Sequence, residues 1–140
     1  DIEKGNLRFA CLLHDIGIVT IQRAILEKPG DFTEEEWKII REHPVTGAKI
    51  IENVTSLKPI APVVRSHHEW YDGKGYPDRL KGEKIPYLSR IIAVADAYTA
   101  MISEMPWYKT VSKEEAKEDL KAGAGSQFDP EIVEAFCRIV

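Results

Sequence analysis

Three helix-start signals spread along the chain restrict it to a helical fold. Two have the spacing of a capping box, in which two side chains reciprocally satisfy the first amide groups of a helix. The third is an aspartate followed by proline, typical of an N-cap and first helical residue. These signals are the pairs Thr33–Glu36 and Ser112–Glu115 and the dipeptide Asp129-Pro130. No segment shows convincing strand-like alternation, so we expect an all-α fold, a compact bundle of about six to seven helices.

The composition indicates an ordinary globular domain and limits its partners. The chain has 140 residues, of which 44% are hydrophobic and 30% charged, with a net charge of −4. This length suits one domain with a real core. The net negative charge argues against a surface for nucleic-acid polymers. A small phosphate ester stays possible, because a metal site supplies its own positive charge and residues 65–90 are locally cationic.

Targeting signals are absent from the printed sequence. No apolar run approaches the roughly 20 residues of a membrane span, and no signal peptide precedes the first helix. We therefore expect a cytoplasmic protein without membrane contact in this segment. Cys11 and Cys137 lie far apart on expected apolar helix faces, which predicts two buried free thiols. The chain begins at Asp1 without an initiator methionine, so we expect it to be part of a longer protein.

All four histidines of the chain stand at expected helix ends. They are His14, His43, His67 and His68. Taken singly, each is better explained as a helix cap or a surface residue. Taken together, with Asp15 directly after His14, they predict a metal centre. Because adjacent helical side chains diverge by about 100°, His14 and Asp15 suit a pair of metals better than one.

Asp96 is the acidic residue most in need of a partner. All residues from Ile91 to Tyr98 except Asp96 are apolar or alanine. An ionised carboxylate in such surroundings must be paired or bound to a metal. An ion pair with an arginine is the alternative; we favour the metal, because the imidazoles need a carboxylate partner.

The expected donors indicate a class of chemistry. Imidazole and carboxylate ligands without thiolate suit iron, manganese, nickel or zinc. A carboxylate that bridges two such ions, about 3.5–4 Å apart, is the arrangement of metal-assisted phosphoester hydrolysis. No nucleophile elbow, Walker motif or Rossmann glycine pattern is present. The loop from Trp70 to Pro86 is long for a helical domain, and loops of this length are often functional.

These motifs, in this order, resemble the HD-GYP branch of the HD superfamily of metal-dependent phosphohydrolases. The resemblance covers nearly the whole chain. The matching residues are 12–17, His43-Pro44 with Gly47, His67-His68-Glu69, Asp72-Gly73, Gly75-Tyr76-Pro77, Arg90-Ile91, Asp96-Ala97-Tyr98, Gly125 and 127–130. The long middle motif is highly specific, whereas a lone His-Asp pair is not.

The resemblance implies that residues 1–140 are an HD-GYP-like phosphohydrolase domain that lacks its N-terminal helices. It implies hydrolysis of cyclic di-GMP through a metal-bridging hydroxide, with two divalent ions, iron or manganese, and nickel or zinc as alternatives. The implied ligands are His14, Asp15, His43, His67, His68 and Asp96, with Asp15 as the bridging, catalytic carboxylate. The implied substrate contacts are Gly75, Tyr76, Pro77, Arg90 and Lys109. A diguanylate cyclase domain is an implied protein partner.

Three departures from the family pattern leave two alternatives open. The family's first histidine ligand would lie upstream of the printed sequence. Ile18 replaces a family lysine, and Met105 replaces an arginine, with Lys109 one position beyond the second family cation. A degenerate domain that acts as a regulatory or protein-interaction module is one alternative. An HD phosphohydrolase for another nucleotide phosphoester is the other.

Overall fold

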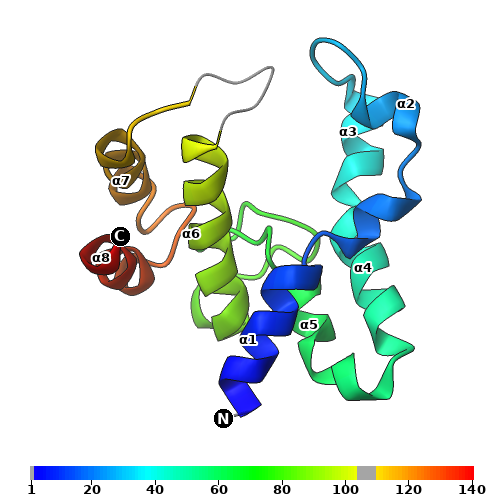
Figure 1. Ribbon diagram of the computed structural model, residues 1–140, viewed down its shortest axis with the longest axis horizontal. Coiled ribbons are helices and arrows are strands. Elements are labelled where there is room, and N and C mark those ends of the chain that lie inside the picture. Colours follow the sequence, from blue (N-terminus) through cyan, green and yellow to red (C-terminus); the bar gives the residue numbers. More distant parts are fainter. Residues whose placement is uncertain (1, 104–109) are drawn as a thin grey trace. The chain divides into compact units, whose positions relative to one another are not determined.

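The computed structural model describes residues 2–103 and 110–140, which form helices and connecting loops (Figure 1). The elements are α1 (Ile2–Leu13), η1 (Ile16–Thr20), α2 (Arg23–Leu26), α3 (Glu34–Arg41), α4 (His43–Glu52), η2 (Thr55–Ile60), α5 (Ala61–Arg65), η3 (Gly82–Lys84), α6 (Tyr87–Ile102), α7 (Lys113–Ala122) and α8 (Pro130–Ile139). The described ranges contain no strand, only an isolated bridge between Ala124 and Phe128. The all-α expectation is confirmed. The helices α2 and α5 are short, with four and five residues.

The expected helix starts are present as hydrogen-bonded caps. The Thr33 hydroxyl accepts the Glu36 amide before α3, and the Glu36 carboxylate accepts the Thr33 amide. Ser112 and Glu115 form the same box before α7. Asp129 accepts an amide of the first turn of α8, and proline follows it at the first helical position. These local bonds satisfy amide groups that a helix leaves without an internal partner.

Two helix boundaries differ from the expectation. Helix α1 ends at Leu13, so His14 and Asp15 lie in the turn beyond it and not in its last turn. The apolar run predicts a helix from Arg90 to about Glu104, but α6 starts at Tyr87, because the Pro86 carbonyl already accepts the amides of the first turn. Because His14 and Asp15 lie beyond α1, their side chains are not held at the separation of about 100° that adjacent helical residues have.

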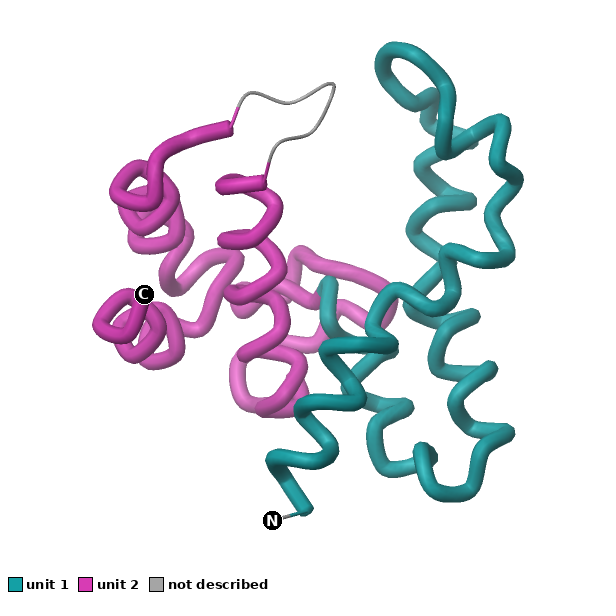
Figure 2. Tube along the Cα trace, viewed as in Figure 1, with its two compact units in different colours: residues 1–68 teal, residues 69–140 magenta. Residues whose placement is uncertain are grey.

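The chain forms two compact units, residues 1–68 and residues 69–140 (Figure 2). The first unit is organised around α4, which packs on η1, η2, α3 and α5. Its buried apolar residues come from α1, α4, η2, α5 and the residue that follows η1. They are Ala10, Ile21, Ala48, Ile51, Ile60, Ala61, Val63 and Val64. All four histidines belong to this unit.

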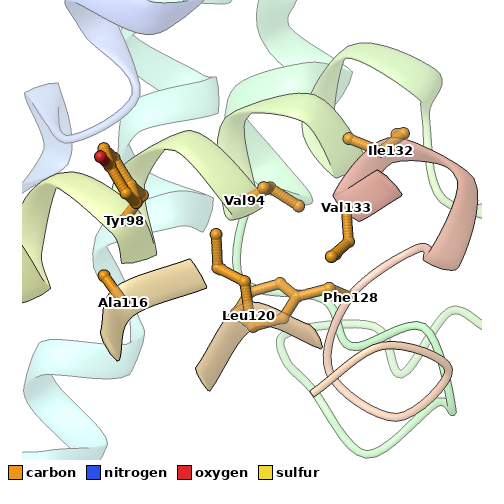
Figure 3. Close-up of a cluster of buried hydrophobic side chains, with 7 residues drawn as sticks. All are labelled: Val94, Tyr98, Ala116, Leu120, Phe128, Ile132 and Val133. Atoms are coloured by element: carbon orange, nitrogen blue, oxygen red, sulfur yellow. The ribbon is translucent and has the colours of Figure 1, made fainter. Parts of the chain in front are cut away.

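The second unit packs α6 against α7 and α8 (Figure 3). Its core cluster joins these helices and the turn before α8. The members are Val94, Tyr98, Ala116, Leu120, Phe128, Ile132 and Val133. The loop that follows His68 belongs to this unit and is attached to the turn before α8. There the Gln127 and Ser126 carbonyls accept the amides of Tyr71 and Asp72 at 3.1 and 2.8 Å.

One expectation about the thiols is wrong. Cys11 is exposed, because Ala10 is the buried residue of α1, and Cys137 is half-buried. Both thiols are free. Within the described residues, no helix has the length and apolar character needed to cross a membrane.

Candidate metal centre

His14, His43 and His67 are oriented by the same local contact. In each, the ring Nδ1 lies within hydrogen-bond distance of the backbone carbonyl three residues earlier. The pairs are His14–Cys11 at 2.7 Å, His43–Ile40 at 2.7 Å and His67–Val64 at 2.6 Å. A carbonyl only accepts hydrogen bonds, so Nδ1 carries the hydrogen in each ring. The lone pair is therefore on Nε2, the atom left to bind a metal.

The two carboxylate oxygens of Asp15 lie close to these three Nε2 atoms. Its Oδ1 lies 3.1 Å from His43 Nε2 and 3.5 Å from His67 Nε2. Its Oδ2 lies 3.4 Å from His14 Nε2. One oxygen thus faces two imidazoles and the other faces a third. This division is the geometry that a carboxylate needs to bridge two ions.

Four residues offer donor atoms close enough for a single ion. Donors of Asp15, His43, His67 and His68 lie within 4.8 Å of one another. The His68 ring completes the group, with its centroid 4.1 Å from that of His67 and 5.0 Å from that of His43. His14 lies outside this group of four but touches it through Asp15 and an edge-on contact with His67 at 5.1 Å.

The electrostatics of the cluster fit a bound cation. His43 and His67 are 4% and 2% exposed, and their Nε2 atoms lie 3.4 Å apart. Two lone pairs at that distance repel unless a cation or a proton lies between them. Burial opposes ionisation of Asp15, but its close contacts with His14, His43 and His67 hold the pKa of its carboxyl well below the usual range. The cluster thus surrounds an ionised carboxylate with imidazole nitrogens, a donor set that suits a divalent transition metal.

Close backbone packing brings Asp15 to the histidines. A Cβ added at Gly17 would lie 2.0 Å from the His43 carbonyl oxygen and 2.7 Å from the Gly47 amide nitrogen. Gly17 therefore allows η1, which starts directly after Asp15, to rest on the first turns of α4. The sequence alone predicts Gly17 only as the stop of the first helix. Gly47, the glycine that Gly17 packs against, was among the matched motif residues. A glycine at such a position can indicate a close approach of two backbones, and it was the available signal for this contact.

Comparison with known proteins identifies the family. The family model described as "HD domain" matches residues 2–132. The chain belongs to the HD domain family.

The relatives of this HD domain include cyclic dinucleotide phosphodiesterases. It is 40% identical over 136 residues to a cyclic di-GMP phosphodiesterase of Thermotoga maritima, covering 96% of this chain and 37% of the relative. It is 37% identical over 134 residues to a 3'3'-cGAMP-specific phosphodiesterase of Vibrio cholerae, covering 94% of this chain and 26% of the relative. The printed chain therefore spans well under half the length of these relatives.

A solved structure shares the fold of the HD domain. It is described as an HDG"Y"P protein from Bdellovibrio bacteriovorus, with a TM-score of 0.74 and 20% sequence identity. The match covers 96% of this chain and 42% of that chain. The HD membership expected from the motifs is thereby confirmed.

The remaining expected site residues of the HD domain belong to the second unit. Asp96 lies half-buried on α6, and its role as a ligand stays a prediction. In the loop, Gly75 is buried, whereas Tyr76 and Pro77 are half-buried and joined by a cis peptide bond. The Arg90 guanidinium pairs with Asp129 at 2.5 Å. Lys109 and Met105 lie outside the described residues.

Glu69 is a residue whose role sequence reasoning missed. It follows His68 directly, is 3% exposed, and its two oxygens accept the amides of Asp78 at 2.6 Å and Leu80 at 3.0 Å. Burial raises the pKa of the Glu69 carboxyl, against the opposing effect of the backbone amides of Asp78, Leu80 and Arg79. The signal was its place beside the histidine pair, but its hydrogen-bond partners are nine and eleven residues away.

Proposed function

We propose that this HD domain is the metal-dependent phosphodiesterase module of a longer protein and hydrolyses cyclic di-GMP. The observation that carries the proposal is the Asp15 carboxylate, one oxygen facing His43 and His67 and the other facing His14. A site of this form can hold two divalent ions with one shared carboxylate. The sequence similarity to cyclic di-GMP phosphodiesterases supports the substrate.

The proposed ligands are the residues expected from the motifs. They are His14, Asp15, His43, His67, His68 and Asp96. We propose iron or manganese as the metal, in keeping with a donor set of imidazole and carboxylate. Divalent ions held there would activate water near neutral pH and neutralise phosphoryl charge.

The chain's own residues supply orientation and charge at this site. The backbone carbonyls of Cys11, Ile40 and Val64 hold three imidazoles with Nε2 inward, so the donor atoms are in place before a metal arrives. The burial of His43 and His67 keeps water away from their ring edges and strengthens the electrostatic interaction with an ion. We further propose that the Gly75-Tyr76-Pro77 segment, Arg90 and Lys109 contact the substrate.

The test is hydrolysis of cyclic di-GMP by the full-length protein loaded with manganese or iron(II). We expect Asp15→Asn to lower kcat by about 100-fold or more, because a neutral amide cannot bridge two cations. Asp31→Asn is the matched control, since Asp31 is exposed and lies outside the cluster, and it should leave kcat unchanged. Absence of hydrolysis of any cyclic dinucleotide by fully metal-loaded wild-type protein would reject the proposal.

A second candidate substrate is 3'3'-cGAMP, which the 37% identical Vibrio cholerae relative is named for. The same assay, run on both dinucleotides, separates the candidates by the ratio of their kcat/KM values. A ratio that favours cyclic di-GMP supports the first candidate, and the reverse ratio supports the second.

A further inference from the structure

The helical arm formed by residues 22–42, all of which the structure describes, has no buried residue. The arm belongs to the first unit and comprises α2, α3 and the loop between them (Figure 1). Its apolar side chains include Leu26, Trp37 and Ile39, which are 37%, 39% and 45% exposed. A surface helix normally buries its apolar side chains against its own domain, so this arm indicates an interaction surface.

The arm is held together by its own contacts. The Lys28 ammonium lies 2.7 Å from the Glu36 carboxylate, which also accepts the Thr33 amide in the capping box. The rings of Phe32 and Trp37 meet edge to face, with their centroids 5.2 Å apart. The arm thus presents α3 as an ordered helix, and binding there does not require the ordering of a flexible segment.

Three exposed residues form a stripe along one face of α3. Glu34, Trp37 and Arg41 follow the i, i+3, i+7 spacing of a single helix face. The Arg41 guanidinium lies over the Trp37 ring, 5.7 Å from its centroid. Within the described part of the chain, the Glu34 carboxylate forms no salt bridge. Tryptophan and arginine are the residue types that most often carry the binding energy of protein interfaces.

The charges on this stripe are complementary to the same stripe in the opposite direction. Glu34 lies in the first turn of α3 and Arg41 at its end, with Trp37 between them. Two antiparallel copies of α3, related by a two-fold axis beside Trp37, bring each Glu34 next to the Arg41 of the other copy. Parallel copies would instead bring like charges together, which costs affinity. A two-fold interface requires a self-complementary surface of this kind.

We infer that this stripe is a dimer interface, on which a second copy of the chain docks through its own α3 in antiparallel orientation. The inference does not depend on the proposed hydrolysis. Helix α3 has eight residues, about 12 Å of helix, so two paired copies bury less than the roughly 1,200 Å² of a stable interface. The dimer is therefore weak, with a Kd in the micromolar range or above.

The first experiment measures the dimer Kd of the full-length protein by sedimentation velocity, from low micromolar to near-millimolar concentration. Glu34→Arg and Arg41→Glu should each raise this Kd about tenfold or more, because each places like charges at both symmetric contacts. Glu35→Arg is the matched control. It makes the same change in the same exposed turn, with the same loss of interaction with the helix dipole, but on another face. Its Kd should stay within about twofold of wild type at physiological salt.

The second experiment recombines the two charge reversals. Glu34→Arg protein mixed with Arg41→Glu protein should form a heterodimer more tightly than either variant forms a homodimer, because opposite charges meet again at both contacts. The double variant should recover a Kd within about threefold of wild type for the same reason. Glu34 and Arg41 are two turns apart on α3 and are not neighbours within one helix, so this recovery reports a contact between copies.

Four outcomes overturn the inference. The first is wild-type protein that is monomeric at every concentration. The second is a loss in Glu34→Arg no greater than that in Glu35→Arg, which would make it an effect of helix stability or net charge. The third is a mixture that dimerises no better than its two components. The fourth is a dimer with the same Kd in all variants, which would use another surface of the protein.

Discussion

At the scale of single residues, the site is built from one repeated contact. His14, His43 and His67 each place Nδ1 on a carbonyl three residues back, at the point where a helix ends or the next begins. For His43, the expected alternatives of a helix-capping residue and a metal ligand are therefore compatible. The capping contact fixes the ring so that Nε2 is left for another partner. Asp15 then adds a negative charge to donors that are otherwise imidazole nitrogens.

The low pKa of Asp15 predicts a pH dependence of stability in metal-free protein. As pH falls below about 4, the unfolded chain takes up a proton at Asp15 before the folded chain does. The stability from Asp15 is therefore present above the unfolded pKa and is lost as pH falls toward the lower folded pKa. Urea unfolding between pH 6 and pH 3 in the presence of a chelator should show this loss, and Asp15→Asn should reduce it. An unchanged pH slope in Asp15→Asn, as in the exposed control Asp31→Asn, would contradict this assignment.

At the scale of elements, the decisive contact is between η1 and α4. The His43 carbonyl and the Gly47 amide form the surface on which Gly17 rests. A Cβ added at Gly47 would in turn lie 3.2 Å from the Val64 side chain. The short 3-10 helix therefore packs backbone to backbone on α4. This packing sets the position of Asp15, the N-cap residue of η1, relative to the imidazole of His43.

Gly17→Ala should destabilise the protein and weaken metal binding together. The added methyl would meet backbone atoms at 2.0 and 2.7 Å, and backbone cannot move aside as a flexible side chain can. We expect a loss of about 1–3 kcal/mol in the free energy of unfolding, the usual cost of overpacking. The loss is measured by urea denaturation, with metal affinity followed by titration.

Gly5→Ala is the control for this prediction. Gly5 lies inside α1 with no atom within 4 Å of a hypothetical Cβ, so alanine there should add up to about 1 kcal/mol of helix stability. Equal stabilities of Gly17→Ala and wild type would show that η1 does not rest on α4 in solution.

At the scale of the whole molecule, the expected ligands are divided between two compact units. His14, Asp15, His43, His67 and His68 belong to residues 1–68, and Asp96 belongs to residues 69–140. The boundary between the units falls between His68 and Glu69, inside the motif that carries the resemblance. The first unit alone brings together the imidazoles and one carboxylate, which is enough to bind one ion.

Metal binding should therefore raise the stability of the folded chain. A ligand at about 100 times its Kd adds about 2.7 kcal/mol to the free energy of unfolding, which raises Tm by several degrees. We expect manganese to produce this shift in differential scanning calorimetry and a chelator to reverse it. His67→Ala should abolish the shift, and calcium, which prefers oxygen ligands, should give none. A manganese shift that persists in His67→Ala would place the ion elsewhere.

The sequence by itself determined the helix starts and predicted the candidate metal ligands. The Thr33–Glu36 capping box can be predicted from the sequence because its two partners are three residues apart. Hydrogen bonds of such short range form at the start of a helix whatever the rest of the fold. His14-Asp15 and His67-His68 were recognisable because chemistry limits which side chains bind metals. The thiol of Cys11 was wrongly expected to be buried, because a helix periodicity does not say which side another element will cover.

Only the tertiary structure decided which distant groups meet. The division of the Asp15 oxygens, the contact of Gly17 with the His43 carbonyl and the pairing of Arg90 with Asp129 join residues far apart in sequence. The hydrogen bonds from the Asp78 and Leu80 amides to the Glu69 carboxylate likewise depend on how the intervening loop folds back. Packing forces that bring such groups together act through the whole unit, so no short window of sequence contains them.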